Sequence, residues 1–154
     1  MKTEKKSQNA YMKEALVEAE KARSEGEVPV GCVIVKDGII VARARNSVEK
    51  EGCVLGHAEL NAIETASEKL GKFLYGCEMY VTVEPCAMCA GAISHARIDG
   101  LYFGAREERT GCCGSLYNIP EDDRFFATVK VTGGVMEEEC KRLIREFFAE
   151  RRKG

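Results

Sequence analysis

Two short motifs carry the residues of this 154-residue chain that are best suited to chemistry. The first is His57-x-Glu59, and the second is Pro-Cys86-x-x-Cys89. Imidazole nitrogen and thiolate sulfur are ligands that Zn²⁺ prefers, so His57, Cys86 and Cys89 are candidate metal ligands. Three protein ligands leave the fourth tetrahedral position open for water, which is typical of catalytic rather than structural zinc sites.

Glu59 is expected to be the proton carrier of this site. At helical spacing it shares a stripe with four apolar residues, Ala62, Ile63, Ala66 and Leu70. A carboxylate on an apolar face is costly to bury, whereas a carboxyl group beside an activated water can take up and release protons. The alternative is that Glu59 only caps the N-terminus of a helix, where acidic residues are common because they stabilise the helix dipole.

Three alternatives for the cysteines stay open. Cys86 and Cys89 could form a thioredoxin-type redox pair, although this leaves His57-x-Glu59 unexplained. A structural zinc would need a fourth ligand, for which the candidates are Cys53, Cys77, Cys112 and Cys113. Otherwise Cys112 and Cys113 are expected to be small packing residues in a loop, and the remaining cysteines are expected to be buried, namely Cys32, Cys53, Cys77 and Cys140. His95 is expected to cap the end of a helix.

The length predicts a single domain over residues 1–154, large enough for a hydrophobic core. No apolar run approaches the roughly 20 residues that span a bilayer. The first residues are polar and lack an apolar signal region, which predicts a cytoplasmic protein with free or metal-bound cysteines. The net charge of −2 gives no global basic footprint for a nucleic acid.

The pattern of apolar residues predicts alternating helices and strands in the order α-β-β-α-β-α-β-β-α. The expected helices span residues 9–26, 57–70, 85–95 and 136–151. The expected strands span residues 30–35, 39–44, 79–83, 101–103 and 128–132, with a hairpin turn at Asp37-Gly38. Residues 1–8 are expected to be a flexible tail, and residues 105–127 a long loop. This order predicts a three-layer α/β/α sandwich with a central mixed five-stranded sheet.

The last expected helix has an apolar stripe and a cationic end. The stripe comprises Cys140, Leu143, Ile144, Phe147 and Phe148. The cations are Arg142, Arg145, Arg151, Arg152 and Lys153. They are the best local candidate for an RNA-binding patch, although they could simply complement the negative end of the helix dipole.

The chain resembles the cytidine-deaminase superfamily, and within it the bacterial tRNA-specific adenosine deaminases. His-x-Glu followed by Pro-Cys-x-x-Cys is the signature of zinc nucleobase deaminases. The resemblance covers about residues 9–152 and includes four longer strings, which are Glu27-Val28-Pro29-Val30-Gly31, residues 80–92, Phe103-Gly104-Ala105-Arg106 and residues 111–116.

The resemblance implies hydrolytic deamination of the wobble adenosine of a tRNA anticodon to inosine, with one Zn²⁺ per subunit. The base would be flipped into the pocket, and Glu59 would carry protons to the ring and to the leaving amine. The resemblance further implies a homodimer that binds the anticodon stem-loop across its subunits. The residues that it matches to substrate contacts are Asn46, Val28, Pro29, Glu107, Arg109 and Phe148.

The departures from the family pattern concern substrate recognition. Residues 53–56 read Cys-Val-Leu-Gly where the family has Asp-Pro-Thr-Ala, Phe126-Ala127 replaces Asn-His, and Glu107 replaces Asp. A deaminase of a free nucleobase, nucleoside or nucleotide, of the guanine or cytosine and deoxycytidylate type, is therefore the alternative. A non-catalytic zinc-binding interaction module is a third possibility. An RNA substrate predicts a basic patch around the pocket mouth, whereas a small substrate predicts a neutral or acidic rim.

Overall fold

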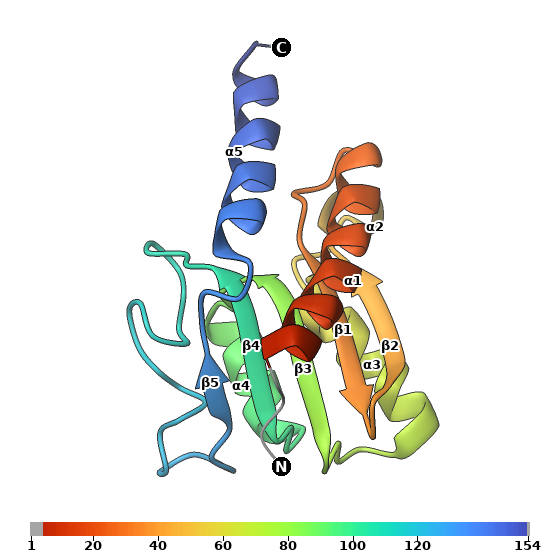
Figure 1. Cartoon of the computed structure of the whole chain (residues 1–154), viewed down its shortest axis with the longest axis vertical. Coiled ribbons are helices and arrows are strands. Elements are labelled where there is room, and N and C mark those ends of the chain that lie inside the picture. The colour runs from red at the N-terminus through yellow and green to blue at the C-terminus, as the bar shows by residue number, and fades with distance from the viewer. Residues whose placement is uncertain (1–4, 154) are drawn as a thin grey trace.

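The computed structural model describes residues 5–153, which form helices and strands in the arrangement of Figure 1. The helices are α1 (Lys5–Ser24), α2 (Val48–Glu51), α3 (Ala58–Leu70), α4 (Ala87–His95) and α5 (Glu137–Lys153). The strands are β1 (Gly31–Lys36), β2 (Ile39–Arg45), β3 (Cys77–Val83), β4 (Gly100–Ala105) and β5 (Lys130–Thr132). The predicted order of elements is confirmed, with α2 as an addition. The expected flexible tail is wrong for residues 5–8, which belong to α1, and its residues 1–4 lie outside the described part.

The five strands form one mixed sheet in the order β2-β1-β3-β4-β5. β1 pairs antiparallel with both β2 and β3, and the pairs β3–β4 and β4–β5 are parallel. The β1–β2 hairpin turns at Asp37 and Gly38, whose φ angles of 51° and 76° are those of a type I′ turn. The predicted hairpin and mixed sheet are therefore confirmed.

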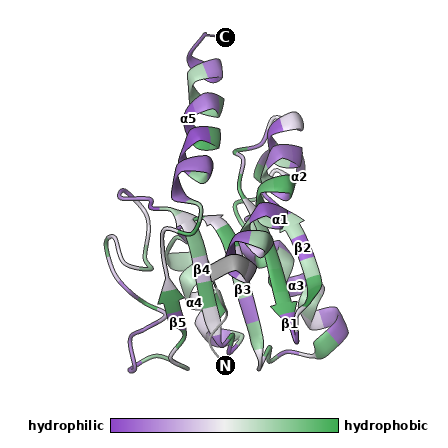
Figure 2. Ribbon diagram, viewed as in Figure 1, coloured by the Kyte–Doolittle hydropathy of each residue, from purple (hydrophilic) through white to green (hydrophobic). Residues whose placement is uncertain are grey.

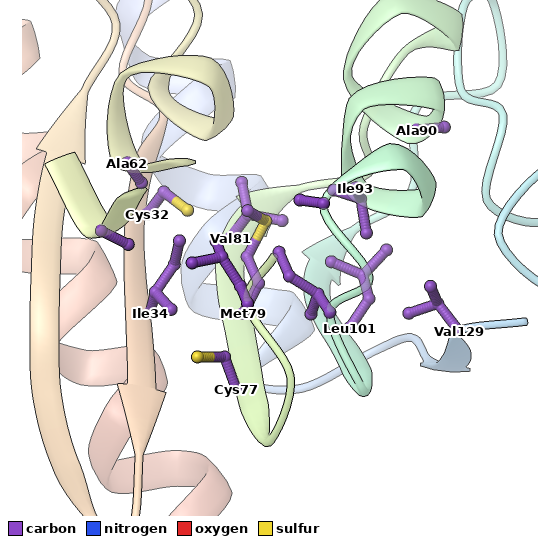
Figure 3. Packing of buried hydrophobic residues seen from close by; sticks show 14 of the residues in the cluster. Cys32, Ile34, Ala62, Cys77, Met79, Val81, Ala90, Ile93, Leu101 and Val129 are labelled. Atoms are coloured by element: carbon purple, nitrogen blue, oxygen red, sulfur yellow. The ribbon is translucent and has the colours of Figure 1, made fainter. Parts of the chain in front are cut away.

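Helices cover both faces of the sheet, as the three-layer prediction requires. β1 shows the alternation, since Cys32 and Ile34 join the core beneath α3 and α4, whereas Val33 and Val35 join the core beneath α1. Figure 3 shows the first of these cores, in which Ala62 of α3 and Ile93 of α4 lie over side chains of the strands, such as Val81. This packing fixes the N-terminal ends of α3 and α4 beside the end of β3.

Helix α1 lies very close to β1 because the first residue of that strand is a glycine. A Cβ atom on Gly31 would lie 1.9 Å from the carbonyl oxygen of Ala15 and 2.5 Å from the amide nitrogen of Ala19. The amide of Gly31 also donates a hydrogen bond of 3.1 Å to the hydroxyl of Thr82. The contact leaves no room for any larger residue at this position.

Helix α5 packs its N-terminal half on β4 and extends beyond the sheet (Figure 1). Phe147 is buried, but Phe148 is 43% exposed, so its predicted place on the apolar stripe is wrong. Arg23 of α1 binds the carboxylate of Glu146 at 3.0 Å, and Arg151 donates to the carbonyl of residue 26. The protruding part of α5 is largely hydrophilic (Figure 2).

In the part of the chain that the structure describes, every helix is too short or too polar to cross a membrane.

Candidate functional site

The candidate metal ligands lie where two helices begin. His57 is the N-cap residue of α3, and Cys86 is the N-cap residue of α4. Cys89 lies in the first turn of α4, three residues after Cys86, so both thiols point to the same side of that helix. Two helix N-termini thus converge on one point, and their dipoles favour thiolates there.

The distances between these ligands match those of a tetrahedral zinc site. Nδ1 of His57 lies 3.7 Å from Sγ of Cys86 and 3.4 Å from Sγ of Cys89. Zn–N and Zn–S bonds of about 2.0 and 2.3 Å at tetrahedral angles place nitrogen and sulfur roughly 3.6 Å apart. All three donor atoms lie within 4.8 Å of one another. The described residues therefore fit one Zn²⁺ and supply three ligands, while the cysteines considered as a fourth ligand are outside this group.

The side chains are also electrostatically prepared for a cation. Hydrogen bonds from Cys89 and from the His57 ring lower the pKa of the Cys86 thiol to about 3, despite its burial. The same contact with Cys86 raises the pKa of His57, although burial opposes this. Cys86 is thus the thiol predisposed to ionise, whereas its hydrogen bond with Cys89 and burial raise the pKa of the Cys89 thiol.

Glu59 is buried, as its position on the apolar stripe predicts. Its side chain is 4% exposed and lies in the first turn of α3. Burial raises the pKa of the Glu59 carboxyl to about 7, and the hydrogen bond from its own backbone amide and the charge of His57 oppose this rise. A carboxyl group with a pKa near neutrality can both accept and donate a proton.

A cavity of about 290 Å³ lies directly beside these groups. Its lining includes six of the predicted site residues, which are Val28, Asn46, His57, Glu59, Cys86 and Glu107. Small-molecule pockets start at roughly 300 Å³, so this cavity suits one base-sized group rather than a larger ligand. Residues far apart in the sequence thus meet at one site.

Asn46 is held in place by backbone groups on both sides. Its amide nitrogen donates to the carbonyl of Val28 at 3.2 Å, and its oxygen accepts from the amide of Val48 at 3.0 Å. A side-chain amide has two donor hydrogens and two acceptor lone pairs. These two bonds therefore leave one donor and one acceptor of Asn46 for a ligand.

The other predicted residues lie outside the lining. Pro29 is buried next to Val28, and Cys89 is buried behind the cavity. Arg109 is exposed on the loop next to Thr110, which does line the cavity. Phe148 is on the exposed part of α5.

The cysteines outside the metal group divide as predicted, except for one. Cys32, Cys77, Cys112, Cys113 and Cys140 are buried. Cys53 is exposed, so the prediction that it is a buried packing residue is wrong. The reason is that residues 52–56 form a surface loop before α3, in which Val54 is 74% exposed. His95 ends α4, where its ring lies 3.7 Å from that of Phe126.

Sequence reasoning missed two buried carboxylates that shape the cavity. Glu27 accepts hydrogen bonds from the amides of Glu49 and Lys50 at 2.9 and 2.7 Å, and so caps α2.

Glu84 accepts four hydrogen bonds from the loop that follows β4. Burial raises the pKa of Glu84, but these hydrogen bonds outweigh it and lower the pKa overall. A charged residue directly after a mostly apolar strand was the signal available for Glu84.

The lining of the cavity is acidic. It contains five carboxylates, those of Glu27, Glu49, Glu59, Glu84 and Glu107, and among the described residues no lysine or arginine. The basic patch that an RNA substrate predicts around the pocket mouth is therefore not found within the lining itself. Lys50 follows the lining residue Glu49 in the sequence, and Arg109 precedes the lining residue Thr110. Both cations are exposed outside the lining.

Comparison with known proteins relates this geometry to a family. Residues 5–105 match the family model of the cytidine and deoxycytidylate deaminase zinc-binding region. A tRNA-specific adenosine deaminase from Bacillus subtilis strain 168 is 46% identical over 144 residues, which cover 93% of this chain and 89% of that protein.

Solved structures show the same relationship. One structure, from a study of A-to-I editing by tRNA:A34 deaminases at the wobble position of transfer RNA, has a TM-score of 0.83 and 40% identity, and the match covers 87% of this chain and 98% of that chain. A guanine deaminase from Bacillus subtilis matches with a TM-score of 0.60 and 38% identity over 63% of each chain.

Proposed function

Because this chain belongs to the cytidine and deoxycytidylate deaminase family, we propose that it is a zinc-dependent hydrolytic deaminase that converts the wobble adenosine of a tRNA anticodon to inosine. The observation that carries the reaction class is the convergence of His57, Cys86 and Cys89 beside the buried carboxyl group of Glu59. The substrate is supported by relatives that are named as tRNA-specific adenosine deaminases and cover most of the chain.

The metal ligands and Glu59 divide the chemistry between them. His57, Cys86 and Cys89 would hold Zn²⁺, which when bound supplies an activated water at neutral pH. Glu59 takes one proton from the attacking water and delivers it to N1 of the adenine ring. It then takes the remaining proton of the hydroxyl group added at C6 and delivers it to the amine, which leaves as ammonia. Because Glu59 is buried, its proton is kept from exchanging freely with bulk water during this transfer.

Asn46, Val28 and Glu107 are proposed to receive the flipped nucleotide. Asn46 retains one donor and one acceptor, which match the paired donor and acceptor groups on an adenine edge or a ribose. Val28 supplies an apolar surface for the base, with Pro29 buried behind it. The small cavity fits an extruded base, while the rest of the anticodon loop lies outside it.

The RNA backbone is proposed to contact cationic residues away from the acidic lining. Arg109 lies on the loop beside the cavity. On α5, Arg145, Phe148 and Arg152 are all exposed and have the spacing of one helix face. Arginines attract phosphates, and an exposed aromatic ring can stack on an unpaired base.

Deamination of a free base is the second candidate function, and the acidic lining favours it. The carboxylates of the lining repel phosphate but accept a neutral base such as guanine. The similarity to a guanine deaminase points in the same direction over part of the chain.

The deciding experiment compares these substrates with the zinc-loaded full chain. The protein is incubated with an anticodon stem-loop that carries adenosine at the wobble position, and inosine is measured by nuclease digestion and chromatography. Guanine and deoxycytidylate are tested in parallel for ammonia release. We expect inosine from the stem-loop. Ammonia release from a free base or nucleotide, without inosine from the stem-loop, would replace the proposed substrate.

A homodimer in the cytoplasm is part of the same proposal. Two surface loops expose large apolar side chains, namely Val54, Leu55, Leu116 and Tyr117. Exposed apolar groups of this size are commonly covered in an interface. Light scattering after size-exclusion chromatography is expected to give twice the mass of the chain, and the monomer mass would contradict this part of the proposal.

A further inference from the structure

A buried carboxylate next to the metal site has no role in the chemistry above. Glu84 directly follows β3, two residues before Cys86, and its side chain is 3% exposed. Its burial would be costly without hydrogen-bond partners. All the partners that the structure gives it come from one loop, residues 107–115.

The carboxylate of Glu84 is saturated by this loop. Oε1 accepts from the amide of Glu107 at 3.0 Å and from the hydroxyl of Ser115 at 2.5 Å. Oε2 accepts from the amides of Cys113 and Ser115 at 3.1 and 2.9 Å. A carboxylate has about four acceptor sites. Glu84 therefore has none left for a substrate, even though it lies at the cavity wall.

The loop is also packed tightly around this carboxylate. A Cβ atom on Gly111 would lie 2.4 Å from Cδ of Glu84 and 2.4 Å from the carbonyl oxygen of Glu107. The amide of Cys112 donates to the carbonyl of Pro85 at 2.9 Å. The loop is thus fixed to the segment between β3 and α4 at several points.

This loop supplies one wall of the substrate cavity. Glu107 and Thr110 line the cavity, and Arg109 lies between them in the sequence. The amide that Glu107 gives to Glu84 fixes the backbone from which its own side chain projects. A change at Glu84 that removes these hydrogen bonds therefore releases this wall of the cavity.

We propose that Glu84 is a positioning residue that holds residues 107–115 as a preformed wall of the substrate pocket and thereby sets substrate affinity. This inference rests on the proposed deaminase function and adds a specificity role to a residue outside the metal group. The substrate meets a wall that is already ordered, so binding does not require the loop to be ordered first.

The test is Glu84→Gln in the zinc-loaded full chain, with the anticodon stem-loop as substrate. The amide group keeps the shape but turns its NH₂ toward backbone N–H donors, which leaves buried groups unsatisfied. We expect KM to rise about tenfold, with kcat within about threefold of wild type. Zinc content is expected to stay at one per chain. Glu64→Gln, at an exposed carboxylate of α3 outside the cavity lining, is the matched control and should leave KM unchanged.

Ser115→Ala is a second variant, and it leaves the buried charge of Glu84 unchanged. It removes one of the four hydrogen bonds and should raise KM about threefold. If Glu84→Gln does not fold, this variant decides the question.

A wild-type KM in Glu84→Gln, or loss of activity in proportion to loss of zinc, would overturn the inference. An inactive wild-type protein on the stem-loop refutes the proposed substrate instead. In that case the same variants are compared on guanine, so the two failures remain distinct.

Discussion

At Glu59, the same burial that costs free energy also prepares the group for proton transfer. The carboxyl group lies in the first turn of α3, and burial brings its pKa to about 7. A bound Zn²⁺ acts in the opposite direction and favours the carboxylate. Burial thus favours the protonated form of Glu59 and the metal favours the deprotonated form, and a proton carrier has to adopt both.

Replacing Glu59 by Ala should abolish catalysis while preserving the metal site. General acid–base groups contribute about 10²–10⁴-fold, so deamination is expected to fall by at least that factor. Metal analysis should still give one zinc per chain, because Glu59 is outside the ligand group. Glu64→Ala, an exposed carboxylate of the same helix, is the control. Loss of both zinc and fold in Glu59→Ala would show a structural role.

Zinc affinity should fall as the solution becomes more acidic. Protons compete with the metal for its ligands, and the contact with Cys86 raises the pKa of His57. Lowering the pH from about 7.5 to about 5.5 is therefore expected to weaken zinc binding progressively, because His57 must lose a proton to bind. Competition with a chromophoric chelator measures this dependence. Cys53→Ser should leave the curve unchanged, and a curve without pH dependence would exclude His57 as a ligand.

The metal ligands and the proton carrier could be predicted from the sequence because their side chains are suited to this chemistry. Glu84, which acts by holding a distant loop, could not be predicted. His57, Cys86 and Cys89 have ligand side chains in a recognisable spacing, and Glu59 is a charge on an apolar stripe. Glu84 binds a loop more than 20 residues away, as in its hydrogen bond with residue 107. No local pattern in the sequence indicates that hydrogen bond.

At the scale of elements, the metal site depends on the sheet that aligns two helices. Both α3 and α4 pack on the same face of the sheet, and the ligands lie at their N-terminal ends. The predicted helices and strands are confirmed because most of them are marked by apolar residues at helical spacing or by short apolar runs. α2 was missed because its four residues are too short to show one, and the carboxylate of Glu27 replaces a local cap.

The close contact between α1 and β1 predicts a position that tolerates no side chain. Gly31→Ala should destabilise the protein by about 3 kcal/mol or more, since the new Cβ would overlap the backbone of α1. Gly91→Ala is the control, because nothing lies within 4 Å of a Cβ at that position of α4. It should be neutral or stabilising by about 0.5–1 kcal/mol. Chemical denaturation measures both, and equal stabilities would contradict the packing argument.

At the scale of the whole molecule, the carboxylates of the cavity lining are separated from exposed arginines of α5, a helix that carries charges of both signs. The cavity is lined by carboxylates, whereas Arg145 and Arg152 project from an exposed helix. The net charge of −2 conceals this separation, so the composition could not predict it. An RNA substrate would be held by its backbone at a distance from the reacting base.

Replacing Arg145 and Arg152 together by Ala should weaken binding of the anticodon stem-loop. The slope of log K against log salt is expected to become shallower by about 0.7 for each phosphate that the protein no longer neutralises. Fluorescence anisotropy over a salt series measures both effects. Lys130→Ala is the control. Lys130 is the first residue of β5 and lies beside the start of β4, whereas the loop that lines the cavity follows the end of β4 at residue 105. An unchanged slope in the double variant would exclude α5 as the RNA-binding face.

The two outermost strands of the sheet have a consequence for self-association. β5 has only three residues, and β2 carries Arg43 and Arg45, which are bound by carboxylates of residues 14, 18 and 25. Short or charged edge strands resist the addition of a further strand from another molecule. Two copies of this chain would therefore associate through helices and loops, and the sheet would end at the boundary of each subunit.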